Sequence, residues 1–431
     1  MTTTVTTTAV EHGEPGNGLF LFTLTAYQYG LLTSVFADLR LGPANLQVTL
    51  ITLLFVACAI VRRDRVIQAL GWQSLTVLAL GVVFIPFKML IGLLSPEGLQ
   101  AMRMFFILPL VWAVYAVYAT DSAMRGRIAT IIIWNCVFIA VFGLIHFFFF
   151  PSLVLSSAQT EAYKAGNIYL IPGHSQEAAF FGNASGYGAI LVTGLFAIYL
   201  TRRRTLPYII AFLVITAATY LSISRSASLF ATILLVLYLA DGLTWRRPQG
   251  FVAIAALVAL VLYVVARVPF IGLAVQVAGG RVSSLGRVGA GATSAFADPT
   301  QVGRLQRYEV GLQIAFRDFS HFFFGSADKE EPIIGDINFS DNSFIFLALA
   351  FGVPLAILWI VTVLRRTVGM RVPRDLRQIM IFLFIYVTLI TTPSLSWDMW
   401  LVYAVGLLFI GEDAGARDPS SAEGQTPGFA V

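Results

Sequence analysis

Long apolar runs follow one another through almost the whole chain, with only short polar breaks between them. A helix needs about 20 apolar residues to cross the hydrocarbon core of a bilayer. Only 12% of the 431 residues are charged, whereas soluble domains carry about 25% charged residues, and the mean hydropathy is +0.81. We therefore predict an all-α polytopic membrane protein. The net charge of +5 is then an indicator of topology rather than of nucleic-acid binding.

The apolar runs predict about twelve transmembrane helices in one domain, residues 19–411. These spans are Leu19–Phe36, Ala44–Val61, Ala69–Leu94, Met104–Tyr118, Ile128–Phe150, Ala178–Leu200, Leu206–Leu221, Ser226–Leu239, Phe251–Val268, Asn342–Leu364, Ile379–Thr391 and Trp397–Ile410. Residues 1–18 are a polar tail without the basic start of a cleaved signal peptide. Residues 412–431 are polar, and we expect them to be disordered.

Clusters of arginine predict how the spans are oriented, because basic residues are concentrated in cytoplasmic loops. Each cluster follows an even-numbered span. The clusters are Arg62-Arg63-Asp64-Arg65, Arg125 with Arg127, Arg202-Arg203-Arg204, Arg246-Arg247, and Arg365-Arg366 with Arg371, Arg374 and Arg377. All of them, and both termini, are therefore expected in the cytoplasm.

The same rule predicts a turn around Arg225. Because Arg202–Arg204 and Arg246-Arg247 share one side, the chain must reverse within Leu206–Leu239, and the polar break is Ser222–Ser226. The first half of this hairpin is only about 24 Å long as a helix, so we expect Arg225 below the outer membrane surface. A charge at that depth is costly and indicates a functional role, such as phosphate binding, although a structural pairing is the alternative.

The largest predicted extramembrane segment is an outer loop, residues 269–341, between the ninth and tenth spans. Within it, Gly303–Phe316 has the pattern of an amphipathic helix. Leu305, Leu312 and Phe316 lie on one side, and Arg304, Arg307 and Gly311 recur at three- and four-residue spacing on another. Arginines are uncommon in outer loops, so an anionic ligand is one explanation. Pairing with acidic residues of the loop is the other.

Other candidate residues have equally simple structural alternatives. Lys88 lies inside a span and either binds a ligand or extends to the membrane surface. Arg103 opens the next span and could be an interfacial anchor, and Asp341 or Asn342 could cap the tenth helix. The two cysteines lie in apolar runs, and His321 has no partner at metal-ligand spacing. We therefore expect neither a metal site nor a cofactor.

Several short motifs, taken in order, resemble the O-antigen ligase and Wzy-type polysaccharide polymerase superfamily. They are Phe181-Gly182-Asn183, Ser224-Arg225-Ser226, Gly303-Arg304-Leu305-Gln306-Arg307-Tyr308, His321-Phe322-Phe323-Phe324-Gly325, Asp341-Asn342-Ser343-Phe344 and Phe351-Gly352-Val353. The resemblance runs from Ala178 to the twelfth span. It implies a twelve-span membrane glycosyltransferase of GT-C-like architecture. Such an enzyme works without a metal on undecaprenyl-diphosphate-linked sugars at the periplasmic face of the inner membrane.

Carried over by position, the resemblance implies roles for individual residues. Arg225 and Arg304 match the two diphosphate-binding arginines, and Asp341 is the implied base for the acceptor hydroxyl. Ligases carry a His-Asn pair where this chain has Asp341-Asn342, which favours a polymerase. The remaining implied substrate-binding residues are Arg307, Lys88, Arg103, Asn342, Tyr308 (in place of a tryptophan) and Asn183.

Three functions follow from these patterns. The first is a polymerase that joins lipid-linked repeats, for which the lipid-linked oligosaccharide is both donor and acceptor. The second is a ligase that moves finished glycan to lipid A core. The third is a transporter or flippase with Arg225 lining a polar path, although no inverted repeat is visible in the sequence. Whether a flippase or a chain-length regulator binds the cytoplasmic arginines is left open.

Overall fold

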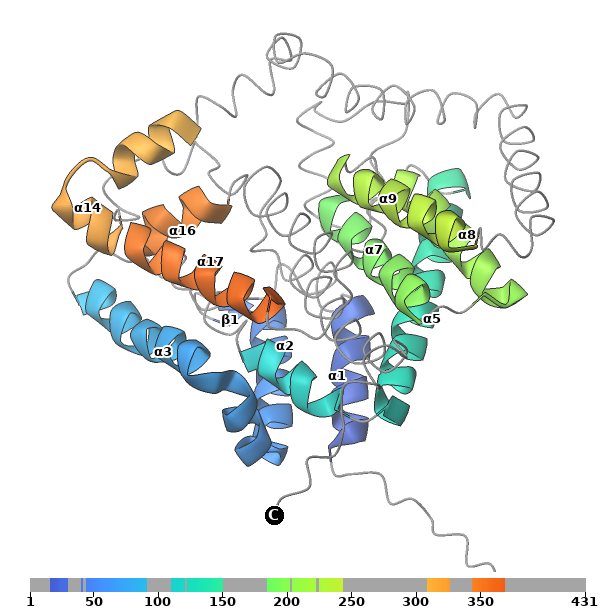
Figure 1. Cartoon of the computed structure of the whole chain (residues 1–431), viewed down its shortest axis with the longest axis horizontal. Coiled ribbons are helices and arrows are strands. Elements are labelled where there is room, and N and C mark those ends of the chain that lie inside the picture. The colour runs from blue at the N-terminus through green and yellow to red at the C-terminus, as the bar shows by residue number, and fades with distance from the viewer. Residues whose placement is uncertain are drawn as a thin grey trace, which may run out of the picture.

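A computed structural model describes residues 16–29, 40–41, 44–90, 110–120, 122–149, 184–201, 204–221, 225–242, 308–325 and 343–368. These residues are helical apart from a ladder of two short antiparallel strands, β1 (Arg40–Leu41) and β2 (Ala44–Asn45). The labelled helices are α1 (Asn17–Tyr29), α2 (Leu46–Val61), α3 (Arg63–Leu90), α5 (Ser122–Phe149), α7 (Ala184–Leu200), α8 (Leu206–Leu221), α9 (Arg225–Gly242), α14 (Phe319–Phe324), α16 (Ser343–Phe351) and α17 (Val353–Val368). Residues 110–118 and 308–315 form two further helices. Figure 1 shows their arrangement.

The first helices alternate in direction, and their arginine-bearing ends meet. The side chain of Arg62, in the turn between α2 and α3, donates a 2.7 Å hydrogen bond to the side chain of Asn17 at the start of α1. Its guanidinium also lies 4.3 Å from the ring centroid of Tyr118, at the end of helix 110–118. Arg125, near the start of α5, donates at 3.2 Å to the carbonyls of Ala119 and Thr120. We call this end of the bundle the basic end.

Helices α5, α7, α8 and α9 continue the alternation. Cys136 of α5 donates from its thiol to the carbonyl of Ile190 in α7 at 3.2 Å. Gly143, further along α5, faces Tyr187 near the start of α7, so the two helices are antiparallel. The end of α7 therefore lies toward the basic end, and Arg204 follows it there. The ends of the helices that carry Arg62, Arg125 and Arg204 therefore lie toward the same end of the bundle, which agrees with the alternation predicted from these three clusters.

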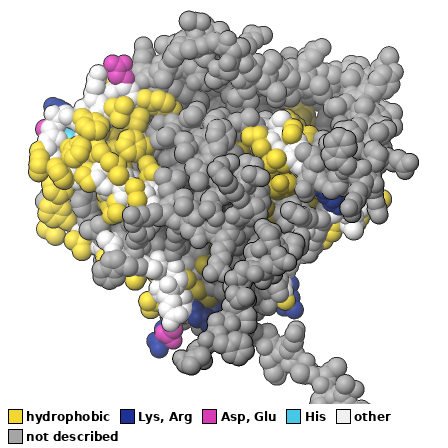
Figure 2. Space-filling model, viewed as in Figure 1, with side chains coloured by type: hydrophobic (Ala, Val, Ile, Leu, Met, Phe, Trp, Pro, Cys, Tyr) yellow, Lys and Arg dark blue, Asp and Glu magenta, His cyan; other side chains and the backbone are white. Residues whose placement is uncertain are grey.

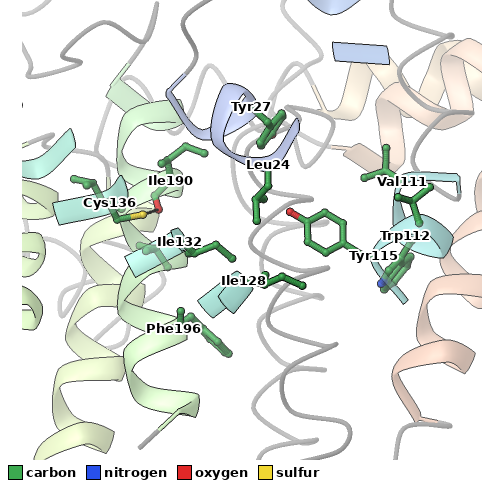
Figure 3. Close-up of a cluster of buried hydrophobic side chains, with 14 of the residues drawn as sticks. Leu24, Tyr27, Val111, Trp112, Tyr115, Ile128, Ile132, Cys136, Ile190 and Phe196 are labelled. Carbon is green, nitrogen blue, oxygen red and sulfur yellow. Dashed lines mark hydrogen bonds between the residues drawn. The ribbon is translucent and has the colours of Figure 1, made fainter. Parts of the chain in front are cut away.

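Large apolar side chains from α1, α5, α7 and helix 110–118 fill the centre of the bundle (Figure 3). Phe20 of α1 stacks on Tyr118 with ring centroids 4.6 Å apart and meets Tyr115 edge-on at 5.0 Å. The polar side chains buried among them include an amide pair, in which Asn135 donates a 2.9 Å hydrogen bond to Gln28. A paired amide in an apolar interior fixes which helix faces meet, because an unpaired one costs about 1–3 kcal/mol.

Helix α8 has the bounds predicted for the seventh span, Leu206–Leu221. Helix α3 begins at Arg63, directly after the Arg62 turn and six residues before Ala69, the predicted start of the third span. It is interrupted at Gly71, whose φ of 66° and ψ of 165° are outside the helical region, so a kink separates its charged first turns from the apolar part that begins close to the predicted start. Glycine adopts that conformation without the clash that a Cβ would cause.

The tenth predicted span, Asn342–Leu364, is interrupted in the structure. Helix α16 ends at Phe351 and α17 begins at Val353, with Gly352 between them at a φ of 89°. Pro354 is the second residue of α17, and proline is favoured in the first turn of a helix, because its missing N–H costs a hydrogen bond further along. The break therefore falls where a continuous helix would lose a hydrogen bond.

Within the described residues, Ala123–Phe147 is the one helical stretch both long and apolar enough to cross a bilayer. Shorter apolar stretches are Leu50–Val61, Ile190–Leu200, Leu206–Leu221 and Val353–Thr362. The predicted spans Phe251–Val268, Ile379–Thr391 and Trp397–Ile410 lie outside the described residues.

Candidate functional site

The predicted turn around Arg225 is borne out by contacts between α8 and α9. Near the tip of this hairpin, the hydroxyls of Tyr220 and Thr232 are 2.6 Å apart. Nearer the basic end, the rings of Phe212 and Tyr238 stack with centroids 4.4 Å apart, and Arg204 donates to the carbonyl of Tyr238 at 3.2 Å. Residues late in α8 therefore meet residues early in α9, which makes the two helices an antiparallel hairpin.

Arg225 is the first residue of α9, so its backbone lies at the tip of the hairpin, at the end opposite Arg204. Close to the tip, α8 buries small and polar side chains, including Thr216, Ala218 and Thr219. The Thr219 hydroxyl donates to the carbonyl of Ile215 at 2.8 Å, so this polar group is satisfied within its own helix. The hairpin as a whole contacts α5 and α7.

The described part of the predicted loop helix is 308–315, and its buried side is not the one carrying the large apolar residues. Gly311, Ile314 and Ala315 are buried, whereas Leu312 and Phe316 are 39% and 57% exposed. Leu312 and Phe316 thus share one side, which is exposed, and Gly311 lies on another, as their spacing predicted. Small residues at Gly311 and Ala315 let the helix backbone approach its neighbours closely, which bulky side chains would prevent. Tyr308, the first residue of this helix, is half-buried against the bundle core.

Helix α14 carries an acid–base pair that the sequence analysis missed. Asp318 caps the helix: one carboxylate oxygen accepts from the backbone N–H of His321 at 2.9 Å, and the other lies 2.7 Å from His321 Nδ1. These hydrogen bonds hold the pKa of the Asp318 carboxyl below its usual value. An ionised carboxylate only accepts, so Nδ1 carries the hydrogen, and in the neutral ring Nε2 is left as a proton acceptor. An aspartate three residues before a histidine at a helix start was the available signal.

Contacts on both sides of α14 hold it against α3 and the α16–α17 break. Gly352 approaches the carbonyls of Phe322 and Phe323 so closely that a Cβ there would lie 2.8 Å from the oxygen of Phe322. The rings of Phe324 in α14 and Phe87 in α3 have centroids 6.3 Å apart. Lys88 is the next residue of α3, so the backbone of this candidate lies beside the 308–325 segment.

The predicted site residues thus fall into two groups within the described chain. Lys88 and Tyr308 belong to helices grouped around α14, whereas Arg225 belongs to the hairpin packed on α5 and α7. Figure 1 shows α14 at the left and α9 at the right of the view, both toward its top. The other predicted residues lie outside the described chain: Arg304, Arg307, Asp341, Asn342, Arg103 and Asn183.

Within the described ranges, no group of three or more His, Cys, Asp or Glu side chains is arranged to hold a metal ion. No protein-family model matches the chain, and no curated protein matches its sequence significantly.

Proposed function

We propose that this chain is a membrane glycosyltransferase, a polysaccharide polymerase that transfers a growing glycan from undecaprenyl diphosphate to an incoming lipid-linked repeat. It is a multi-pass protein of a bacterial inner membrane, with about twelve spans and both termini in the cytoplasm. The outer loop, residues 269–341, is periplasmic, and the reaction takes place at that face without a metal or cofactor.

The observation that carries the proposal is the position of Arg225 in the hairpin. Arg225 begins α9 at the tip, while Arg204 marks the basic end. If the basic end is cytoplasmic, as the distribution of arginines favours, the tip faces the periplasm. Helix α8 has 16 residues, about 24 Å, against about 30 Å for the hydrocarbon core. Arg225 then lies within the membrane near its periplasmic side, within reach of a diphosphate at the lipid headgroups.

The membrane location is supported by the large apolar side chains exposed on α5. Large apolar side chains form an exposed stripe along α5 at three- and four-residue spacing. They are Trp134, Phe138, Val141, Ile145 and Phe149. In water, an exposed helix face is usually polar. An apolar stripe of this length fits contact with lipid tails.

The proposed reaction needs few groups. A hydroxyl oxygen of the acceptor sugar attacks the anomeric carbon of the donor, the bond from that carbon to the phosphate oxygen breaks, and undecaprenyl diphosphate leaves. Arg225 and Arg304 stabilise the charge that develops on the leaving diphosphate. Asp341 accepts the hydroxyl proton. Attack opposite the leaving group inverts the anomeric centre.

The acceptor diphosphate is assigned to Arg307, Lys88 and Arg103. Arg307 directly precedes helix 308–315 in the sequence, four residues before Gly311. Lys88 is supported by the contact of its neighbour Phe87 with α14. We assign Tyr308, Asn342 and Asn183 to the sugars.

The test is polymer synthesis by the purified chain in liposomes given only lipid-linked repeats. The unchanged chain and Arg204→Ala are expected to extend glycans, whereas Arg225→Ala and Arg304→Ala make none. Arg204→Ala is the matched control because it removes an arginine from the other end of the same hairpin. Normal polymer from both Arg225→Ala and Arg304→Ala would refute the assignment of the site. Asp341→Asn is expected to lose activity, and full activity would leave Asp341 as a helix cap.

The same assay separates the alternatives. Glycan transfer that begins only when lipid A core is added would identify a ligase. For a transporter or flippase, Arg225→Ala would stop lipid-linked repeats from reaching the periplasmic leaflet. For a polymerase, the repeats still reach that leaflet and polymer alone is lost.

A further inference from the structure

An exposed cluster of phenylalanines on and beside α14 has no role in the proposed chemistry. Phe316 and Phe319 are 57% and 73% exposed, and Phe323 and Phe324 are also exposed. Phe319 and Phe323 have ring centroids 4.4 Å apart, and half-buried Phe322 joins the cluster to the bundle core. We call Phe316, Phe319, Phe323 and Phe324 the phenylalanine cluster. Figure 2, in the same view as Figure 1, shows an apolar area at the upper left of the molecule, where α14 lies.

The phenylalanine cluster is continuous with an apolar face of α3. Val83, Phe87 and Leu90 are all exposed, and their spacing of four and three residues places them on one side of that helix. The 6.3 Å contact between Phe87 and Phe324 joins this face to the cluster. Whatever covers the end of α3 therefore also meets α14.

Polar side chains border the cluster on its other side. Glu309, Arg317 and Asp318 are exposed, and Figure 2 shows acidic, basic and histidine side chains at the edge of the apolar area. An apolar face bordered by charges is typical of a segment that lies in the plane of a membrane interface, with aromatic rings at the boundary and charges in water.

We infer that the 308–325 segment lies in the periplasmic interface of the bilayer, with the phenylalanine cluster inserted among the lipid acyl chains beside the end of α3. This inference rests on the membrane location in the proposed function. It names the lipid bilayer itself as the partner of this surface. The segment that carries Tyr308 and the Asp318–His321 pair would then be held at the depth where lipid diphosphates lie.

The test places single nitroxide labels on the full-length chain in liposomes and compares collisions with oxygen, which concentrates in lipid, and with a water-soluble nickel chelate. Phe319→Cys carries the test label. Asp64→Cys, an exposed position beside the Arg62 turn at the basic end, is the control expected in water, and Phe138→Cys marks the exposed stripe of α5. Cys58 and Cys136 are buried, so the unchanged chain treated with the label provides the blank.

The inference predicts that labels at 319 and 138 collide more often with oxygen than with the nickel chelate, and that the label at 64 shows the reverse. If the label at 138 reports lipid but the label at 319 reports water, the inference is overturned and the membrane location stands. A label at 319 shielded from both reagents would also overturn it, since protein, such as a second copy, would then cover the cluster. If the label at 138 reports water, the membrane location fails, and the inference with it.

Discussion

Replacing Gly352 with alanine is expected to displace α14 from the α16–α17 break. Gly352 has a φ of 89°, which side chains rarely tolerate, and its added Cβ would collide with the backbone carbonyl of Phe323. The same Cβ would lie 2.8 Å from the carbonyl oxygen of Phe322. Both carbonyls belong to α14, so the collision cannot be relieved by turning a side chain. Either α14 moves or the break changes its conformation.

The loss of folding free energy caused by Gly352→Ala can be estimated as the sum of two contributions. A non-glycine residue in a positive-φ conformation costs about 1–3 kcal/mol, and overpacking costs about another 1–3 kcal/mol. Gly71 isolates the first term, because its φ is 66° and a Cβ there meets nothing within 4 Å. Gly126 has neither problem, and alanine in its place should stabilise α5 by about 0.5–1 kcal/mol. From the most to the least stable, the expected order is Gly126→Ala, the unchanged chain, Gly71→Ala and Gly352→Ala.

Thermal unfolding in detergent micelles, followed by tryptophan fluorescence, measures this order. Equal losses for Gly71→Ala and Gly352→Ala would show that the contact with α14 contributes nothing. A Gly352→Ala protein as stable as the unchanged chain would refute both the positive φ and the close approach.

Three other changes test contacts elsewhere in the bundle. Gly143→Ala should destabilise the bundle by about 1–3 kcal/mol, because the new Cβ collides with the Tyr187 hydroxyl. Adding Tyr187→Phe should restore part of the lost stability in the same unfolding measurement. If the second substitution restores nothing, the new Cβ does not collide with this hydroxyl. Tyr220→Phe should cost about 0.5–1.5 kcal/mol through its 2.6 Å bond to Thr232. Thr232→Val should then add little in a double-mutant cycle, and additive losses would contradict the bond. The pKa of Asp318 is lowered by its hydrogen bonds within α14, so its stabilisation of that helix is complete above about pH 3.9 and lost as the pH falls through the depressed value. The mobility of a spin label on α14 should rise only at such acid pH, and a rise that begins well above about pH 3.9 would contradict this role of the carboxylate.

The sequence predicted the hairpin and the alternation of helices well, for physical reasons. Leu206–Leu221 is bounded by arginines on one side and a polar break on the other, so its ends are visible in composition alone. The arginines at Arg62, Arg125 and Arg204 lie together because a helix of this hydropathy can place charges only at its ends. Neither feature depends on detailed packing.

The break at Gly352 and the buried side of helix 308–315 were not predicted, because both depend on tertiary contacts. Residues 342–364 read as one apolar run, and the close approach of α14 to Gly352 is invisible in the sequence, although Pro354 two residues later was an available signal. For helix 308–315, the spacing of the apolar residues grouped Leu312 with Phe316 but did not indicate which side is buried. The exposure of Leu312 is understandable if that side of the segment meets lipid rather than protein.

Of the candidate site, the sequence correctly predicted where the backbone of Arg225 lies: at the tip of a hairpin whose other end carries Arg204. The Asp318–His321 pair was missed, because His321 was judged only by metal-ligand spacing and not by its place in the first turn of a helix. The proposed approach of Arg304 to Arg225 depends on the fold of the predicted outer loop, and Arg304 lies outside the described residues. A run of weak motifs in sequence does not determine that approach.

The most direct test of the central claim is native mass spectrometry of the purified chain with an undecaprenyl-diphosphate-linked oligosaccharide. The account predicts a bound complex for the unchanged chain and for Arg204→Ala, and its loss for Arg225→Ala. Undiminished binding by Arg225→Ala, with the protein folded as judged by its unfolding midpoint, would contradict the proposal that Arg225 at the hairpin tip holds a lipid diphosphate.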